Sequence, residues 1–302
     1  MRIDATRIAL TGASGFCGSH IARAVAGLGA DLVCLGRRPG PVGRHVRWDA
    51  AAGQPDLEDD IDLVIHCAAA VDDLPPGAPG EAIQRAVNVD GTAGLLRAAA
   101  GRPVVQVSSA SVYPPSPATG PVREDRPTGF GHLNAYGRTK AAADALALAA
   151  GAVVLRPRAV YGPGDPHLVP RLLDRVRHGL LPLPGRDVTL SLTAVQNLAD
   201  ACLAAAGLAT GPAWPPGAYN IADAHPYRRD AAVRRVLAAH GVRVRIVHLP
   251  VRAATWAART GRVPGLTPYA VDQVARGVVL DTTRARAGGW EPYWDLDVVF
   301  GG

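Results

Sequence analysis

The sequence predicts an α/β protein with a doubly wound parallel sheet and a smaller mixed α/β lobe. Short runs rich in Val, Ile and Leu alternate with Ala-rich stretches of helical length, and the strand-like runs are apolar throughout. Strands that are apolar on both faces are typical of parallel sheets covered by helices on either side. With 302 residues and 48% hydrophobic content, the chain can bury a sizeable core.

Strands and helices alternate regularly in the first half of the chain. Pattern and composition predict strands over 7–12, 31–36, 61–69, 103–109 and 152–157, with helices over 16–29, 81–101 and 135–151. After about residue 160 prolines become frequent, and we expect strands over 187–195 and 217–223 around a helix over 196–207. Residues 1–160 should therefore form a dinucleotide-binding sheet domain, with sheet elements returning near 188–223. Residues 161–302 should form mainly a substrate-binding lobe.

Charge and composition exclude several classes of protein. The net charge is +6, but the arginines are spread along the chain, which argues against a nucleic-acid partner. No apolar run reaches the roughly 18 residues of a membrane span, and the start lacks the pattern of a signal peptide, so we expect a cytoplasmic protein. The cysteines show neither metal-ligand spacing nor a disulfide framework, so we expect no metal; they are Cys17, Cys34, Cys67 and Cys202.

A glycine-rich turn joins the first strand to the first helix. In "LTGASGFCG" the glycines are Gly12, Gly15 and Gly18. Glycines at such a turn let the backbone approach a pyrophosphate, whose charge suits the positive end of the following helix. Because the motif follows a predicted strand and opens a predicted helix, it favours dinucleotide binding over a purely structural turn.

The end of the second strand indicates which dinucleotide is bound. An acidic residue there would bind the ribose 2′-hydroxyl of NAD, but the chain has Gly36 followed by Arg37 and Arg38. A guanidinium can bind a 2′-phosphate with two hydrogen bonds. The sequence therefore favours NADP(H), with NAD(H) and two merely solvated arginines as the open alternatives.

Six motifs together resemble the extended short-chain dehydrogenase/reductases. They are "TGASGFCG" at 11–18, "HCAA" at 66–69, "NVDGT" at 88–92, "VSSASVY" at 107–113, "YGRTK" at 136–140 and "RPRAVYGPGD" at 156–165. They occur in the family's order and span more than half of the chain. The resemblance implies a Rossmann fold that binds NAD(P).

The resemblance also assigns catalytic roles. Tyr136 and Lys140 are four residues apart, which places both side chains on one face of a helix. By resemblance, Tyr136 is the acid or base, and Lys140, the only lysine of the chain, lowers the phenol's pKa and holds the nicotinamide ribose. Ser109 occupies the position that polarises the substrate oxygen, with Ser108 and Ser111 as its nearest rivals, and Asn88 looks like the supporting asparagine.

Further cofactor contacts follow from the same motifs. Besides Tyr136 and Lys140, we expect contacts from Gly12, Ser14, Gly15, Phe16, Gly18, Arg37, Arg38, Asp49, Ala68, Ala69 and Arg156. His66 and Tyr161 lie beside these positions, and we interpret both as packing and hydrogen-bonding residues that take no part in proton transfer.

One position of the second half separates the branches of this family. Sugar-nucleotide enzymes commonly carry a diphosphate-binding arginine where this chain has Leu190, which we therefore expect in the substrate pocket. The stretches "AVQNLADA" at 194–201 and "LTPYAVDQVARG" at 266–277 instead resemble the 3β-hydroxysteroid dehydrogenase-like branch, although Gln196 replaces its usual aspartate. We expect a largely apolar pocket beside Tyr136.

The leading function is an NADP(H)-dependent ketoreductase or secondary-alcohol dehydrogenase that acts on a bulky, mostly apolar small molecule. The first alternative is a sugar-nucleotide epimerase or dehydratase with tightly bound NAD(P). The second is a non-catalytic, cofactor-sensing protein, which the intact Ser, Tyr and Lys set disfavours. A homodimer is compatible with either enzyme.

Overall fold

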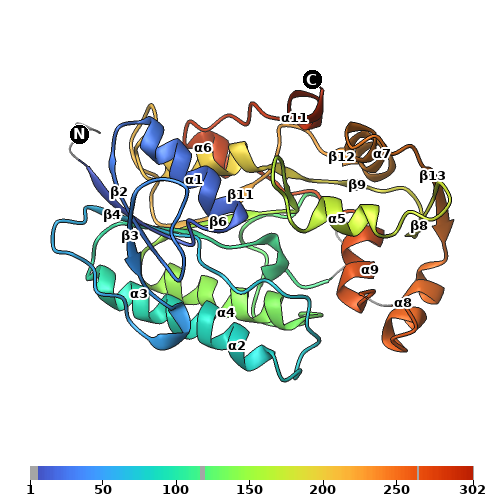
Figure 1. Cartoon of the computed structure of the whole chain (residues 1–302), viewed down its shortest axis with the longest axis horizontal. Helices are drawn as coiled ribbons and strands as arrows, with labels where there is room; N and C mark the ends of the chain where they lie inside the picture. Colours follow the sequence, from blue (N-terminus) through green and yellow to red (C-terminus); the bar gives the residue numbers. More distant parts are fainter. Residues whose placement is uncertain (1–5, 116–119, 264, 302) are drawn as a thin grey trace.

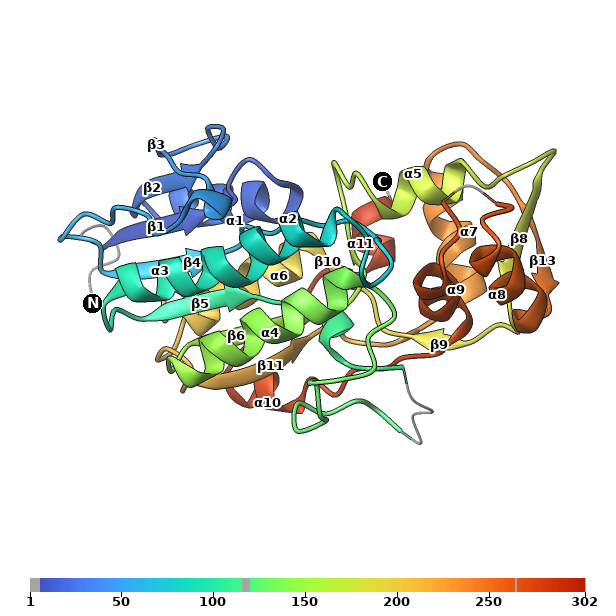
Figure 2. The same ribbon diagram turned by 90° about the horizontal axis from the view of Figure 1, so that it is seen from below.

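The central element of the fold is a parallel sheet of seven strands. The structure, a computed structural model, describes residues 6–115, 120–263 and 265–301. All neighbouring strands of the sheet run parallel, in the order β3-β2-β1-β4-β5-β6-β11 (Figure 2). The strands are β1 (Arg7–Thr11), β2 (Asp31–Gly36), β3 (Arg44–Arg47), β4 (Leu63–His66), β5 (Val104–Val107), β6 (Val153–Pro157) and β11 (Gly217–Ile221). The predicted doubly wound α/β class is confirmed.

Helices cover both faces of the sheet (Figure 2). α1 (Phe16–Gly27) packs beside α6 (Val195–Ala205) on one face, where the largest buried apolar cluster lies. The other face carries α2 (Glu81–Arg85), the π-helical turn η3 (Ala86–Asp90), α3 (Gly91–Ala99) and α4 (Ala135–Ala149). The strand order reverses at β1 and β4, so the carboxyl ends of these two strands open the crevice in which such sheets bind ligands.

The second half of the chain contributes to both the sheet domain and a separate lobe. Of the stretch near 188–223, β11 joins the main sheet, whereas residues 187–195 form two short strands outside it. These are β9 (Thr189–Leu190), which pairs with β12 (Tyr227–Arg228), and β10 (Thr193–Ala194), which pairs with β7 (Val160–Tyr161). The sequence predicted one continuous strand there and did not predict β3.

The lobe is built around a parallel pair of strands, β8 (Leu180–Pro184) and β13 (Arg245–Leu249). Its helices are α5 (Leu168–Leu173), α7 (Arg229–Ala239), α8 (Val251–Arg259) and α9 (Pro268–Ala275), on the right in Figure 1. Thr267 caps α9 by accepting a hydrogen bond from the amide of Ala270, and Pro268 begins the helix. α10 (Thr283–Ala287) contacts β11, and α11 (Leu296–Phe300) contacts α7.

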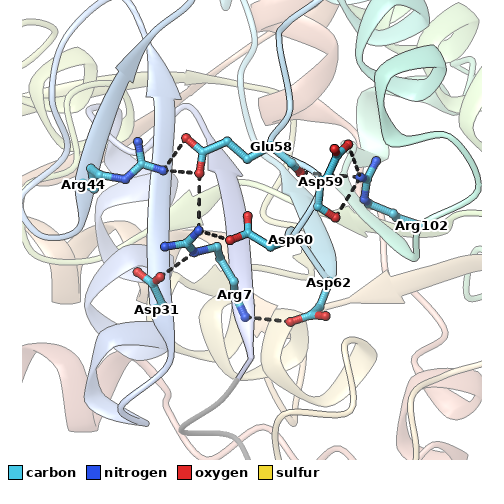
Figure 3. Close-up of polar contacts among 8 residues, drawn as sticks. All are labelled: Arg7, Asp31, Arg44, Glu58, Asp59, Asp60, Asp62 and Arg102. Atoms are coloured by element: carbon cyan, nitrogen blue, oxygen red, sulfur yellow. Dashed lines mark hydrogen bonds and ion pairs between the residues drawn. The ribbon is translucent and has the colours of Figure 1, made fainter.

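The amino ends of the strands are joined by ion pairs that lie on the side of the sheet away from the crevice. Arg7, the first residue of β1, contacts Asp31 at 2.5 Å and also Glu58 and Asp60 (Figure 3). Arg44 contacts Glu58 at 2.6 Å. The carboxylates and Arg44 are about half exposed, so solvent screens these pairs and each contributes little to stability.

Candidate active site

The glycine turn after β1 leaves no room for side chains. Gly12 has a φ of +76°, and a Cβ there would lie 2.7 Å from the backbone nitrogen of Ala68. A Cβ at Gly18 would lie 2.1 Å from the carbonyl oxygen of Gly12. Gly15 precedes α1 and has no side chain that could accept hydrogen bonds from the backbone amides of the first turn. A pyrophosphate fits this turn, because backbone amides and the positive end of a 12-residue helix are open to close approach.

The other expected cofactor residues lie around the same crevice. Ser14 and Gly15 are exposed in the turn, and Phe16 begins α1. Ala68 and Ala69 directly follow β4, where the Ala68 amide donates to Thr11 Oγ1 at 3.1 Å. The structure therefore brings the glycine turn and the "HCAA" segment together.

Arg37 and Arg38 follow β2 at the carboxyl edge of the sheet. Both side chains are exposed, and within the described residues no ion pair engages either of them. The Trp48 amide bonds the Gly36 carbonyl at 3.1 Å, so Asp49 lies close to the end of β2. The Asp49 carboxylate accepts from the Ala51 amide and caps a short helical turn, η2 (Ala50–Ala52). A ligand phosphate could reach both arginines without breaking an existing ion pair.

Tyr136 and Lys140 lie one turn apart on α4, which begins after the cap residue Asn134. Asn134 Oδ1 accepts from the Gly137 amide at 2.8 Å and so fixes the turn that carries Tyr136. Lys140 is only 4% exposed, and its Nζ donates to the Val107 carbonyl at 2.8 Å. The ammonium is thus held at the end of β5, beside the expected nicotinamide position.

The electrostatics of this pair differ from the expectation. Burial raises the pKa of Tyr136 above its ordinary value; the neighbouring Tyr269 side chain adds to the rise, and hydrogen bonding to Ser109 opposes it. Burial likewise lowers the pKa of Lys140. Burial is therefore the largest influence on both pKa values, and the lowering of the phenol's pKa by Lys140 that we expected is not among the main influences on Tyr136.

Ser109 is one of two half-buried serines of the "VSSASVY" segment, the other being Ser111. Ser109 caps the short helical turn η4 (Ala110–Val112), accepting from the Ser111 amide at 3.1 Å, and its own hydroxyl donates to Ser111 Oγ at 3.1 Å. Its rival Ser108 is buried, with no partner for its Oγ among the described residues. Ser111, the other rival, bonds Tyr269 of the lobe at 2.6 Å. Ser109 stays our candidate for the contact to a substrate oxygen.

Asn88 and His66 stabilise the crevice through buried hydrogen bonds. Asn88 is 1% exposed, accepts from the Ala70 amide at 2.8 Å and donates to Thr139 Oγ1 at 3.0 Å, which ties the segment after β4 to α4. His66 lies between Thr11 Oγ1 at 2.7 Å and Thr92 Oγ1 at 3.0 Å. Burial lowers the pKa of His66 to about 3, so the imidazole is neutral and suits the structural role we expected.

Two residues of the expected set are engaged elsewhere. The Arg156 guanidinium is 2% exposed and bonds both Asp144 carboxylate oxygens, the Tyr113 hydroxyl and the Glu124 carbonyl, so we no longer count it as a cofactor ligand. Leu190 is buried in an apolar cluster of the lobe and does not line the pocket beside Ser111. In both cases internal packing uses the side chain that sequence position alone had assigned to a ligand.

Tyr269 is the site residue that the sequence did not reveal. It lies on α9 and lines a small pocket between lobe and sheet domain, together with Ser111, Tyr113, His132, Asn134, Asp272, Gln273 and Arg276. Neither Tyr136 nor Ser109 lines this pocket, so the largely apolar pocket that we expect beside Tyr136 stays a prediction. The Thr-Pro pair before Tyr269 indicates a helix start, but no sequence signal brings that helix to Ser111.

Two classes of feature are absent from the described residues. No group of three His, Cys, Asp or Glu side chains there is arranged to hold a metal ion. No helix within those ranges is long and apolar enough to cross a membrane.

Comparisons with known proteins agree with this geometry. The model of the NAD dependent epimerase/dehydratase family matches residues 8–222. A 2-alkyl-3-oxoalkanoate reductase of Stenotrophomonas maltophilia (strain K279a) is 33% identical over 264 residues, covering 78% of this chain and 76% of the relative. A 3-beta-hydroxysteroid dehydrogenase of Mycolicibacterium neoaurum is 26% identical over 329 residues, covering 98% of this chain and 90% of the relative.

Solved structures share the fold. MoeE5 in complex with UDP-glucose and NAD superposes with a TM-score of 0.74 at 26% identity, covering 98% of this chain and 96% of that one. The family match spans the glycine turn, the Ser109 segment and the Tyr136–Lys140 helix described above. The chain therefore belongs to the NAD-dependent epimerase/dehydratase family of extended short-chain dehydrogenases/reductases and is an NAD(P)-dependent oxidoreductase.

Proposed function

We propose that this protein is an NADP(H)-dependent ketoreductase or secondary-alcohol dehydrogenase for a bulky, mostly apolar carbonyl or hydroxyl compound. The observation that carries the proposal is the arrangement of Tyr136 and Lys140 on one face of α4, with Ser109 near enough to the phenol to oppose the rise in its pKa. The relatives that are named as reductases of 2-alkyl-3-oxoalkanoates and as 3-beta-hydroxysteroid dehydrogenases support this substrate class.

In this proposal each residue has one chemical role. NADPH, when bound, supplies the hydride. Ser109 donates a hydrogen bond to the carbonyl oxygen, and Tyr136 gives that oxygen its proton during reduction or removes it during oxidation. Lys140 holds the nicotinamide ribose from the end of β5, and residues 161–302 supply most of the substrate-binding surface.

The preference for NADPH rests on the exposed pair Arg37 and Arg38 after Gly36. A 2′-phosphate would gain a charge-assisted contact there, worth about 1.5–3 kcal/mol. No carboxylate follows β2 directly to bind a free 2′-hydroxyl, and the nearby Asp49 carboxylate already caps η2.

The test is a reductase assay with NADPH and with NADH. The panel contains a 2-alkyl-3-oxoalkanoate, a 3-ketosteroid and a long-chain aliphatic ketone. We expect reduction of at least one of them, and Tyr136→Phe should lower kcat by about 100-fold or more while NADPH binding stays nearly intact, because only proton transfer is lost. Lys140→Arg should lower both kcat and the affinity for NADPH. A Tyr136→Phe enzyme with near-normal turnover would refute the assignment.

A sugar-nucleotide epimerase or dehydratase is the second candidate, because MoeE5 is a fold neighbour in complex with UDP-glucose. Leu190 offers no charge to a diphosphate at the position where such enzymes commonly carry an arginine, and burying a diphosphate without partners is costly. Calorimetry of the NADP-loaded protein with UDP- and dTDP-sugars should show no binding at millimolar concentration. A micromolar dissociation constant, or turnover of such a sugar, would favour the epimerase instead.

A further inference from the structure

The lobe contributes a second phenol to the active site. Tyr269 lies in the first turn of α9, and its hydroxyl is 2.6 Å from Ser111 Oγ. Ser111 Oγ in turn accepts from Ser109 Oγ at 3.1 Å. A chain of hydroxyl groups therefore runs from the lobe to Ser109, whose side chain opposes the rise in the pKa of Tyr136, the residue that we assign to proton transfer.

The position of Tyr269 is fixed independently of its hydroxyl. Thr267, the cap of α9, donates through Oγ1 to Asp73 Oδ2. The other oxygen of Asp73 accepts from Asn134 Nδ2 at 3.0 Å, and Asn134 caps the helix that carries Tyr136. The starts of α9 and α4 are thus joined through one carboxylate, so removal of the Tyr269 hydroxyl should leave its ring in place.

We propose that Tyr269 is a positioning residue: through Ser111 it orients the Ser109 hydroxyl so that Ser109 donates to the substrate oxygen. The inference rests on the proposed reductase function, because it assigns Ser109 a substrate carbonyl to bind. It adds a residue of the lobe to the Ser, Tyr and Lys set of the sheet domain.

The direction of the hydrogen bonds explains why a phenol is useful here. In the free protein the Ser109 hydroxyl donates to Ser111, so its proton is not directed at a substrate. When Ser109 donates to a carbonyl instead, Ser111 can turn its own proton toward Ser109 and needs a new donor for its oxygen. A phenol is a stronger donor than an aliphatic hydroxyl, and donors in a chain polarise one another.

The surroundings of Tyr269 keep it a donor. Burial raises its pKa, and the carboxylates of Asp73 and Asp272 act in the same direction, whereas the Ser111 hydrogen bond and Arg158 oppose the rise. The phenol therefore keeps its proton at neutral pH. With Tyr269 protonated, the chain can run from Tyr269 through Ser111 to Ser109 and on to the substrate.

A kinetic double-mutant cycle tests the proposal. The variants are Tyr269→Phe, Ser111→Ala and the two combined, with Tyr293→Phe as the control because Tyr293 is 73% exposed. We expect each single variant to lower kcat by about three- to tenfold, the size of one hydrogen bond, with unchanged NADPH affinity. The combined variant should be no slower than the slower single variant, because both remove the same chain. Losses that multiply, or a Tyr269→Phe enzyme with wild-type kcat, overturn the proposal.

A spectroscopic measurement decides the matter even if no ketone of the panel is reduced. Protein labelled with 13C at the tyrosine ζ carbon contains seven labelled sites, and the Tyr136 resonance is identified by its loss in Tyr136→Phe. Tyr269→Phe and Ser111→Ala should each shift the Tyr136 resonance, whereas Tyr293→Phe should not. An unmoved Tyr136 resonance in both variants overturns the proposal. If the protein is not a reductase, no ketone of the panel is turned over, but the shifts of the Tyr136 resonance are unaffected.

Discussion

Acidification should destabilise this protein through His66. The imidazole is 2% exposed between two threonine hydroxyls, and burial lowers its pKa to about 3, with a smaller contribution from the charge of Lys140. In the unfolded chain a histidine titrates near about 6.5. Between these two values the unfolded state binds a proton that the folded state excludes, so the free energy of unfolding falls as the pH falls.

The size of the effect follows from the two pKa values. Each pH unit below about 6.5 costs about 1.4 kcal/mol, so His66 should remove about 2 kcal/mol of stability at pH 5. The loss should continue to about pH 3 and then level off. For a protein whose total stability is about 5–15 kcal/mol, a loss of this size is readily measured.

Urea unfolding at pH 7, 6 and 5 measures this effect. His66→Gln keeps a neutral polar side chain. Whatever its stability at pH 7, its free energy of unfolding should therefore fall by about 2 kcal/mol less than that of the wild type between pH 7 and pH 5. His225→Gln is the control, because His225 is exposed and should leave the wild-type slope unchanged. Equal slopes for wild type and His66→Gln would refute the reasoning, since the imidazole would then take up its proton equally in both states.

Three further experiments test other parts of the structure. Asp144→Asn removes the carboxylate that pairs with a buried guanidinium and should lower the free energy of unfolding by about 3–5 kcal/mol in urea titrations; a loss below 1 kcal/mol would mean that water reaches the pair. Gly18→Ala should abolish NADPH binding or folding, because its Cβ would lie 2.1 Å from a backbone oxygen. The control is Gly27→Ala on the same helix, whose Cβ would meet nothing within 4 Å and which should be neutral or stabilising. Equal NADPH titrations for the two variants would contradict the close approach at Gly18. Replacing Arg37 and Arg38 together by Ala should reduce the NADPH-over-NADH preference by about tenfold or more in steady-state assays, and an unchanged preference would mean that both only face solvent.

The sequence carries most of the information about the sheet domain, because local patterns there coincide with tertiary roles. An apolar run with helices on either side of it is recognisable as a buried parallel strand: the predicted strand at 31–36 matches β2, and the one at 152–157 covers all of β6 and one residue before it. The glycine turn is equally local, since the glycines must lie where the backbone passes close to itself. The four-residue spacing of Tyr136 and Lys140 specifies a shared helix face without knowledge of the rest of the fold.

The lobe could not be predicted in the same way, because its short strands pair with partners distant in the sequence. β9 pairs with β12 and β10 with β7, so residues 187–195 form two bridges where their apolar pattern indicated one strand. Likewise, the positions of Arg156 and Leu190 in the sequence do not show what their side chains contact. Arg156 pairs with Asp144, and Leu190 packs in the lobe core.

By itself, then, the sequence determined the fold class and the residues that share a turn or a helix face, because those relations depend on backbone periodicity and local sterics. Only the tertiary structure decided that Ser108 of the "VSSASVY" segment is buried and that Tyr269, 158 residues after Ser111, contacts Ser111 at 2.6 Å. A contact of that kind depends on how the lobe docks on the sheet domain, and no local pattern encodes the docking.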